Sequence, residues 1–164
     1  MSYTVKEISN ILKSNNTFNK ISILSYLTKI TDSEIIKEII SGLDDKEIQV
    51  RGEAFSSLFL NNNDISEILI SSLIHESKNI RGFCALILGN RDNTSAINSL
   101  IDLTKDTSGM VRSCAFGALG HLKATKAKKE IHNGIFDDDV EVKKSAAYAL
   151  YLIEGKLTYT ERKE

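Results

Sequence analysis

The chain has 164 residues, of which 41% are hydrophobic and 26% charged, and its formal net charge is −1. This composition is that of an ordinary globular domain with a core, and the charge balance gives no overall field to attract nucleic acid or an anionic membrane. No apolar run reaches the roughly 18 residues of a membrane span, and the first residues do not resemble a signal peptide, so we expect a cytoplasmic protein.

Apolar residues recur at helical spacing along the whole chain, and proline is absent. The pattern begins with a short leading helix over residues 4–13, and Thr31 to Glu34 read as a capping box before the third helix. No segment alternates with period two, so we expect no sheet. The expected helices cover residues 4–13, 18–30, 33–43, 78–89, 94–105, 109–121, 125–135 and 138–153. Between them, one helix follows an acidic cap at 44–47 and ends near Leu60, and its partner is capped by Asp64 and Glu67.

A basic residue returns every 30 or 31 residues, at Lys20, Arg51, Arg81, Arg112 and Lys143. Valine or isoleucine precedes it in every copy except the weaker first one, where Asn19 does. A period near 30 built from two helices is typical of an α-solenoid, in which each repeat buries its apolar face against its neighbours. We therefore predict one all-α domain over 1–164, an α-α superhelix of about five helix pairs. The repeats fall near 18–43, 44–75, 76–105, 106–136 and 137–154, after a leading helix within 1–14 and before a tail at 155–164.

The best copy of the repeat runs from Asp106 to Gly120, and its pattern is Asp-x4-Val-Arg-x2-Ala-x3-Leu-Gly. This pattern resembles the HEAT-like repeat of the phycobilisome-lyase type over residues 18–153. The resemblance implies that first helices line a convex side and second helices a concave side. It also implies ion pairs of Arg51, Arg81 and Arg112 with Asp45, Asp106 and Asp137, with a gap where His75 replaces the acid.

Catalytic and metal-binding motifs are absent from the sequence. It contains no Gly-x-Ser-x-Gly and no phosphate-binding glycine loop before a helix. The di-iron enzyme deoxyhypusine hydroxylase, another HEAT-like protein, places His-Glu directly after the repeat arginine, whereas Gly82-Phe83 follows Arg81 here. We expect no enzyme activity, no metal and no cofactor, and we expect Cys84 and Cys114 to be reduced residues within helices.

Two features of the second half, His132 and a lysine cluster, are each compatible with more than one role. His132 occupies a core-type position of its repeat, which predicts a hydrogen-bonded, edge or partner-facing side chain. Lys123, Lys126, Lys128 and Lys129 form a basic cluster, but no aromatic residues are interleaved with it and no basic stripe continues it. A solvated helix face is favoured there, and weak nucleic-acid binding through Lys123–Lys129 is the alternative.

The function predicted from these observations is a non-enzymatic scaffold that binds a protein partner on the concave face of the second helices. An accessory subunit of an enzyme, such as a bilin-lyase-like or modification factor, is the other alternative. The last helix is apolar on more than one face, which predicts that the tail (Leu157, Tyr159) or a second chain covers it through Tyr148 or Tyr151. The residues predicted to contact a partner are Glu34, Lys37, Glu67, Ser71, Asn98, Asp102, Lys126, Lys129, His132, Tyr148 and Tyr151.

Overall fold

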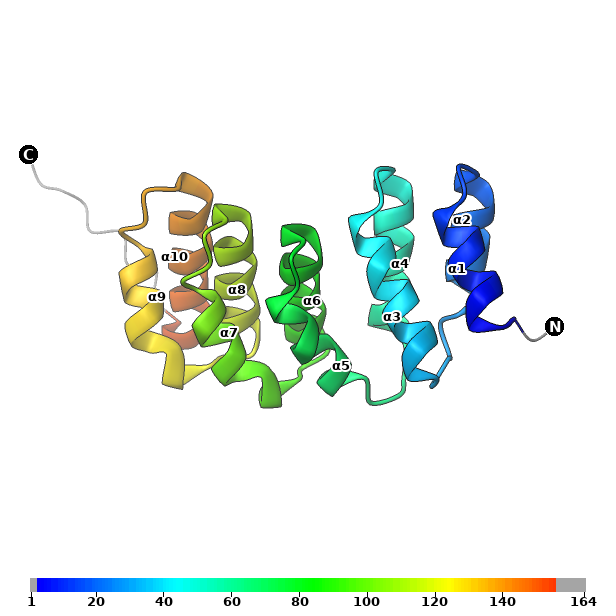
Figure 1. The fold of residues 1–164 in the computed structure, drawn as a ribbon. Helices are drawn as coiled ribbons and strands as arrows, with labels where there is room; N and C mark the ends of the chain where they lie inside the picture. The colour runs from blue at the N-terminus through cyan, green and yellow to red at the C-terminus, as the bar shows by residue number, and fades with distance from the viewer. Residues whose placement is uncertain (1–2, 156–164) are drawn as a thin grey trace, which may run out of the picture.

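The computed structural model of the chain describes residues 3–155, and within them it is helical, without strands. The helices stack in two layers along one direction (Figure 1). The first layer holds α1, α3, α5, α7 and α9, and the second layer holds α2, α4, α6, α8 and α10. The first helix of each repeat therefore lies in the second layer, and the second helix lies in the first layer. Their bounds are Val5–Lys13 (α1), Thr17–Tyr26 (α2), Ser33–Ser41 (α3), Ile48–Leu60 (α4), Ser66–Ser71 (α5), Lys78–Asn90 (α6), Ile97–Leu103 (α7), Gly109–His121 (α8), Lys128–Gly134 (α9) and Val140–Glu154 (α10). The predicted all-α solenoid is therefore confirmed for this part of the chain.

Each long helix of the second layer buries the same two positions of the repeat. The residue before the basic residue is buried in α4, α6, α8 and α10, and so is the leucine eight positions later. These positions are Val50 and Leu58, Ile80 and Leu88, Val111 and Leu119, and Val142 and Leu150. A spacing of eight residues returns to the same side of an α-helix, so one apolar stripe per helix faces the core.

Short 3-10 turns replace parts of the predicted helices in the first layer. Gly42–Asp44 and Ser72–Ile74 follow α3 and α5, whereas Thr94–Ala96 and Thr125–Ala127 precede α7 and α9. The predicted capping box at Thr31 is wrong, because Asp32 is the N-cap of α3 and accepts from the backbone N–H groups of Glu34 and Ile35. A capping box does form in this chain, at Thr4 and Glu7 before α1.

Small residues bring α6, α8 and α10 close together. A Cβ built on Gly89 of α6 would lie 2.7 Å from Cα of Ala118 in α8, and one on Gly120 of α8 would lie 2.6 Å from Cα of Ala149 in α10. These distances are shorter than any real Cβ contact, so only glycine fits at either crossing. Glycine opposite alanine thus sets the close spacing of these three helices.

The junction between α4 and α6 is built differently. Phe59 stands in α4 where Gly89 and Gly120 stand in α6 and α8, and Ile87 stands in α6 where Ala118 stands in α8. The two helices lie farther apart than α6 and α8 do (Figure 1), and the rings of Phe55 and Phe83 meet edge to face between them, with centroids 6.3 Å apart. Bulky side chains therefore hold α4 and α6 farther apart than the glycine–alanine contacts hold α6, α8 and α10.

Candidate functional site

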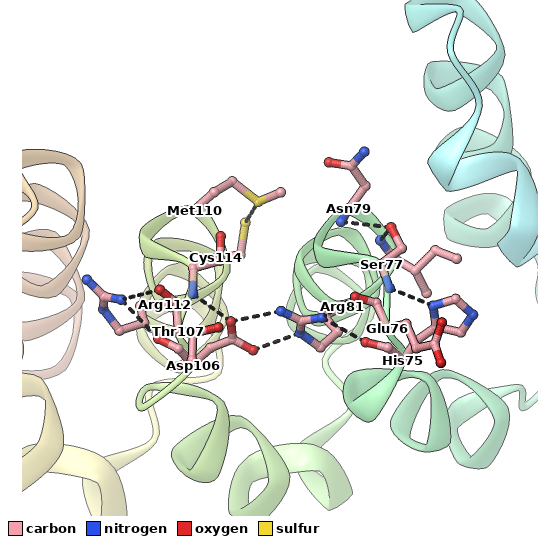
Figure 2. Close-up of polar contacts among 12 residues, drawn as sticks. His75, Glu76, Ser77, Asn79, Arg81, Asp106, Thr107, Met110, Arg112 and Cys114 are labelled. Carbon is pink, nitrogen blue, oxygen red and sulfur yellow. Dashed lines mark hydrogen bonds and ion pairs between the residues drawn. The ribbon is translucent and has the colours of Figure 1, made fainter.

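A ladder of ion pairs follows one edge of the stack and joins consecutive repeats. Arg81 of α6 donates from Nε and Nη2 to the two carboxylate oxygens of Asp106, at 2.7 and 2.9 Å (Figure 2). Arg112 of α8 donates in the same way to Asp137, at 2.8 Å in both bonds. Each arginine lies in a first helix and its aspartate begins the next repeat, so each pair ties two repeats together.

The remaining nitrogen of each arginine holds the guanidinium in place. Nη1 of Arg81 donates to the carbonyl oxygens of His75 and Glu76, both at 2.8 Å. Nη1 of Arg112 donates to those of Asp106 and Thr107, at 2.9 and 3.4 Å. Every arginine of the ladder therefore binds the backbone five and six residues before it and turns its other edge toward the next repeat, as Figure 2 shows for Arg81.

The contacts of the ladder change the acidity of its members. Burial raises the pKa of Asp106, but the hydrogen bonds from Arg81 and from the Ser108 N–H outweigh it, so the pKa lies below the ordinary value of 3.8. The hydrogen bonds from Arg112 lower the pKa of Asp137. The pKa values of Arg81 and Arg112 are raised by the same carboxylates, which keeps both pairs charged at neutral pH.

The N-terminal end of the ladder differs from the prediction. Asp45 does not pair with Arg51 as predicted; its carboxylate accepts from Lys20 Nζ of α2, at 2.6 Å. Arg51 uses Nη1 to bind the carbonyl oxygens of Asp45 and Lys46, at 2.8 and 3.2 Å. Within residues 3–155 no carboxylate pairs with Arg51, because His75 stands where the next aspartate would be. The predicted gap at His75 is confirmed.

His75 keeps one of the two tasks of the aspartate that it replaces. Its Nδ1 accepts from the backbone N–H of Ser77, at 3.0 Å, as the carboxylate of Asp106 accepts from Ser108. An imidazole that accepts at Nδ1 carries its proton on Nε2, and it cannot offer the two oxygens that an arginine fork binds. The turn is thus preserved while the ion pair is lost.

Two hollows meet at this gap on the first layer. One, of about 350 Å³, lies between α3 and α5 and is lined by Lys37, Ile40, Ser41, Ile68, Ser71, Ser72, Ile74, His75 and Ile80. The other, of about 630 Å³, lies between α5 and α7, and its lining includes Ile74, His75, Ser99, Asp102 and Asp106. Ile74 borders both hollows and is 90% exposed. We call these two hollows and Ile74 the α5 groove.

The nine predicted contact residues on second-helix segments are all exposed. Lys37, Ser71 and Asp102 line the α5 groove. Glu34 lies beside it through its 2.7 Å ion pair with Lys37. The others line neither hollow, and they are Glu67, Asn98, Lys126, Lys129 and His132.

The basic cluster and His132 lie toward the far end of the stack. Lys126 donates to Asn98 at 2.6 Å, and Lys128 pairs with Glu154 at 3.1 Å, so two of the four lysines have partners on neighbouring elements. His132 is about half exposed, and its Nε2 lies 4.0 Å from Glu154. It is an edge histidine, one of the alternatives that its position left open.

The end of the stack exposes two stacked tyrosines. Tyr148 and Tyr151 of α10 have ring centroids 6.2 Å apart, and both side chains are exposed. Gly155 ends α10 in the left-handed conformation, with φ of 67°. The predicted cover by Leu157 and Tyr159 lies outside the described residues.

The repeat pattern does not identify Ile74 as a contact residue or Arg91 as a link between repeats. Arg91 donates to carbonyl oxygens at the end of α4, namely those of Leu58, Phe59, Asn61 and Asn63. Burial lowers its pKa. This link joins α6 to α4 at the edge of the stack opposite the gap.

Groups able to do chemistry are scarce in the described part. No set of three or more His, Cys, Asp or Glu side chains is placed there to hold a metal ion, and none of its helices is long and apolar enough to cross a membrane. Burial raises the pKa of Cys84 to about 12 and that of Cys114 to about 11, so both thiols are protonated at neutral pH and poor nucleophiles.

Comparison with known proteins agrees with this architecture. The family model of HEAT repeats matches residues 66–151, more than half of the chain. No curated protein matches the sequence. Among solved structures, the complex of CpcE and CpcF of phycocyanin lyase from Nostoc sp. PCC7120 aligns over 95% of this chain and 67% of that chain, at 20% identity and a TM-score of 0.64.

Designed repeat proteins are also similar in fold. An engineered protein aligns over 93% of this chain and 81% of its own, at 17% identity and a TM-score of 0.55. A designed armadillo repeat protein in complex with the peptide (KR)4 aligns over 91% and 81%, at 16% identity and a TM-score of 0.52. Because identities this low show the fold alone, the family match is what assigns the chain: it belongs to the HEAT-repeat family.

Proposed function

We propose that this chain is a non-enzymatic scaffold that binds a protein partner across the second helices, at the α5 groove. The observation that carries the proposal is Ile74, a large apolar side chain that is 90% exposed between two hollows of about 350 and 630 Å³. Exposed apolar residues within polar-rimmed hollows are typical of protein-binding surfaces. Lys37, Ser71 and Asp102 supply the polar rim.

The similar structures support this proposal because two of them are complexes with a protein or a peptide. CpcE and CpcF form a complex with each other, and the designed armadillo protein holds a peptide. The likeness to a lyase complex also keeps an accessory role in an enzyme assembly as the second candidate. Either role requires a protein-binding face. Self-association through Tyr148 and Tyr151, a cytoplasmic location and weak nucleic-acid binding by Lys123–Lys129 stay predictions.

Affinity capture from a lysate of the source cells, read by quantitative mass spectrometry, tests the face. We expect Ile74→Lys to reduce capture of the partner by about ten-fold or more, since a charge replaces a central apolar contact. Ile48→Lys is the matched control, because Ile48 is 68% exposed on α4 and lines neither hollow. The proposal would be contradicted if Ile74→Lys captured the partner as well as the parent does and Ile48→Lys did not capture it. The binding face would then lie on the layer that contains α4.

A further inference from the structure

The gap in the ladder leaves an arginine prepared for a ligand that the described chain does not provide. Arg51 binds two backbone carbonyls through Nη1, five and six residues before it, as Arg81 and Arg112 do. In those two arginines this anchoring presents Nε and Nη2 to a carboxylate of the next repeat. In Arg51 the same two nitrogens have no partner within residues 3–155.

The repeat itself identifies the missing ligand. At the two arginine rungs the ligand is a carboxylate that accepts two hydrogen bonds, at 2.7 to 2.9 Å. A planar guanidinium fork matches a carboxylate in this bidentate manner, and the bonds are charge-assisted. His75 stands at the sequence position of the aspartate but turns its Nδ1 to the Ser77 N–H and supplies no oxygens, so a carboxylate from outside can take the place of the absent aspartate.

The acids that neighbour Arg51 or the slot in the chain do not occupy its fork. Asp45 is engaged by Lys20, and Asp44 accepts from Asn79 at 2.8 Å. Within residues 3–155, neither Glu47 nor Glu76 forms an ion pair with Arg51. The slot adjoins the part of the α5 groove lined by Ile74, His75 and Lys37. An apolar side chain beside the incoming carboxylate would therefore meet Ile40, Ile68 and Ile80 at the wall of the 350 Å³ hollow.

We propose that Arg51 and the adjoining α5 groove bind a protein segment in which an aspartate or glutamate lies next to an aliphatic residue. The carboxylate completes the rung that His75 leaves open, and the aliphatic side chain enters the hollow between α3 and α5. This proposal rests on the proposed function, because it states which side chains a protein partner would place on the same face. The slot lies at one edge of the α4–α6 junction, and Phe59, which replaces glycine, lies at the opposite end of α4.

The test selects dodecamer peptides from a random phage-displayed library on the full chain. Selected peptides are then made acetylated and amidated, so that only side chains carry carboxylates, and their Kd is measured by fluorescence anisotropy. We expect enrichment of Asp or Glu beside Leu, Ile or Val. We expect affinity to fall about ten-fold or more when the peptide acid becomes its amide, because charge-assisted hydrogen bonds are lost.

Two variants and one control locate the effect. Arg51→Gln removes the fork and His75→Asp fills the slot, so each should weaken binding about ten-fold or more. Lys46→Gln removes a nearby exposed charge and should leave Kd within about two-fold. Peptides without an acid, or acidic peptides that bind the Arg51→Gln protein as tightly as the parent, would overturn the carboxylate site but leave the scaffold standing. Failure to select any peptide, together with no Ile74-dependent capture from lysate, would overturn both.

Discussion

Replacement of Gly120 by alanine should destabilise the protein by about 2–3 kcal/mol, the cost of overpacking a tight interior. The new Cβ would lie 2.6 Å from Cα and 2.8 Å from Cβ of Ala149. These atoms belong to the backbone and first side-chain carbon of α10, so no rotamer change relieves the contact, and α8 and α10 must separate. Urea denaturation followed by circular dichroism at 222 nm measures the loss.

The matched control is the same substitution at Gly52, in the middle of α4. A Cβ there meets nothing within 4 Å, and the residue is exposed. Gly52→Ala should therefore stabilise the protein by about 0.5–1 kcal/mol, because alanine favours the helix. If Gly120→Ala stabilised the protein to the same extent, the close approach of α8 and α10 would be wrong.

Replacement of Asp106 by asparagine should cost about 2 kcal/mol at pH 7, since a charge-assisted pair that is largely buried is lost. The side chains of Arg81 and Asp106 are only 15% and 10% exposed, which limits screening by solvent. The folded pKa of Asp106 lies below its ordinary value of 3.8, so the stabilisation is full well above pH 4 and disappears as the pH falls through the folded pKa.

The difference in unfolding free energy between parent and Asp106→Asn should accordingly shrink below about pH 4. Urea titrations at pH 7, 5, 4 and 3 measure it. Asp138→Asn is the control, because Asp138 is exposed and makes no hydrogen bond or ion pair with the described residues; it should change stability by less than about 0.5 kcal/mol. A difference between parent and Asp106→Asn that is independent of pH would contradict the charged rung.

The sequence predicts the helices well because each repeat marks them twice, by apolar spacing and by the recurring basic residue. The ends are less predictable. The helix expected to reach residue 30 ends at Tyr26, and Asp32 rather than Thr31 caps the next helix. The choice of cap is a local competition between neighbouring polar groups, and helix ends vary by a few residues; periodicity resolves neither.

The site is predictable only in part, for a physical reason. Repeat alignment correctly indicates exposed positions such as Lys37 and Asp102, and it locates the gap at His75. It does not decide whether the guanidinium of Arg51 faces Asp45, six residues before it, or the position of His75, 24 residues after it. The backbone carbonyls of Asp45 and Lys46 take Nη1 of Arg51, and this contact turns the fork away from the nearer acid. The hollows depend on how far apart α3, α5 and α7 lie, and the repeat pattern does not specify that separation.

The most direct test of the account is a double-mutant cycle of His75→Asp and Arg51→Gln, measured by urea denaturation. If Arg51 presents its fork to an open slot, His75→Asp should stabilise the parent by about 1 kcal/mol through a new bidentate pair, and should not do so in the Arg51→Gln protein. The effect of the new aspartate on the turn at Ser77 is common to both backgrounds and cancels. An equal effect of His75→Asp in both backgrounds would mean that Arg51 does not face the slot, and the proposed carboxylate site would fall with it.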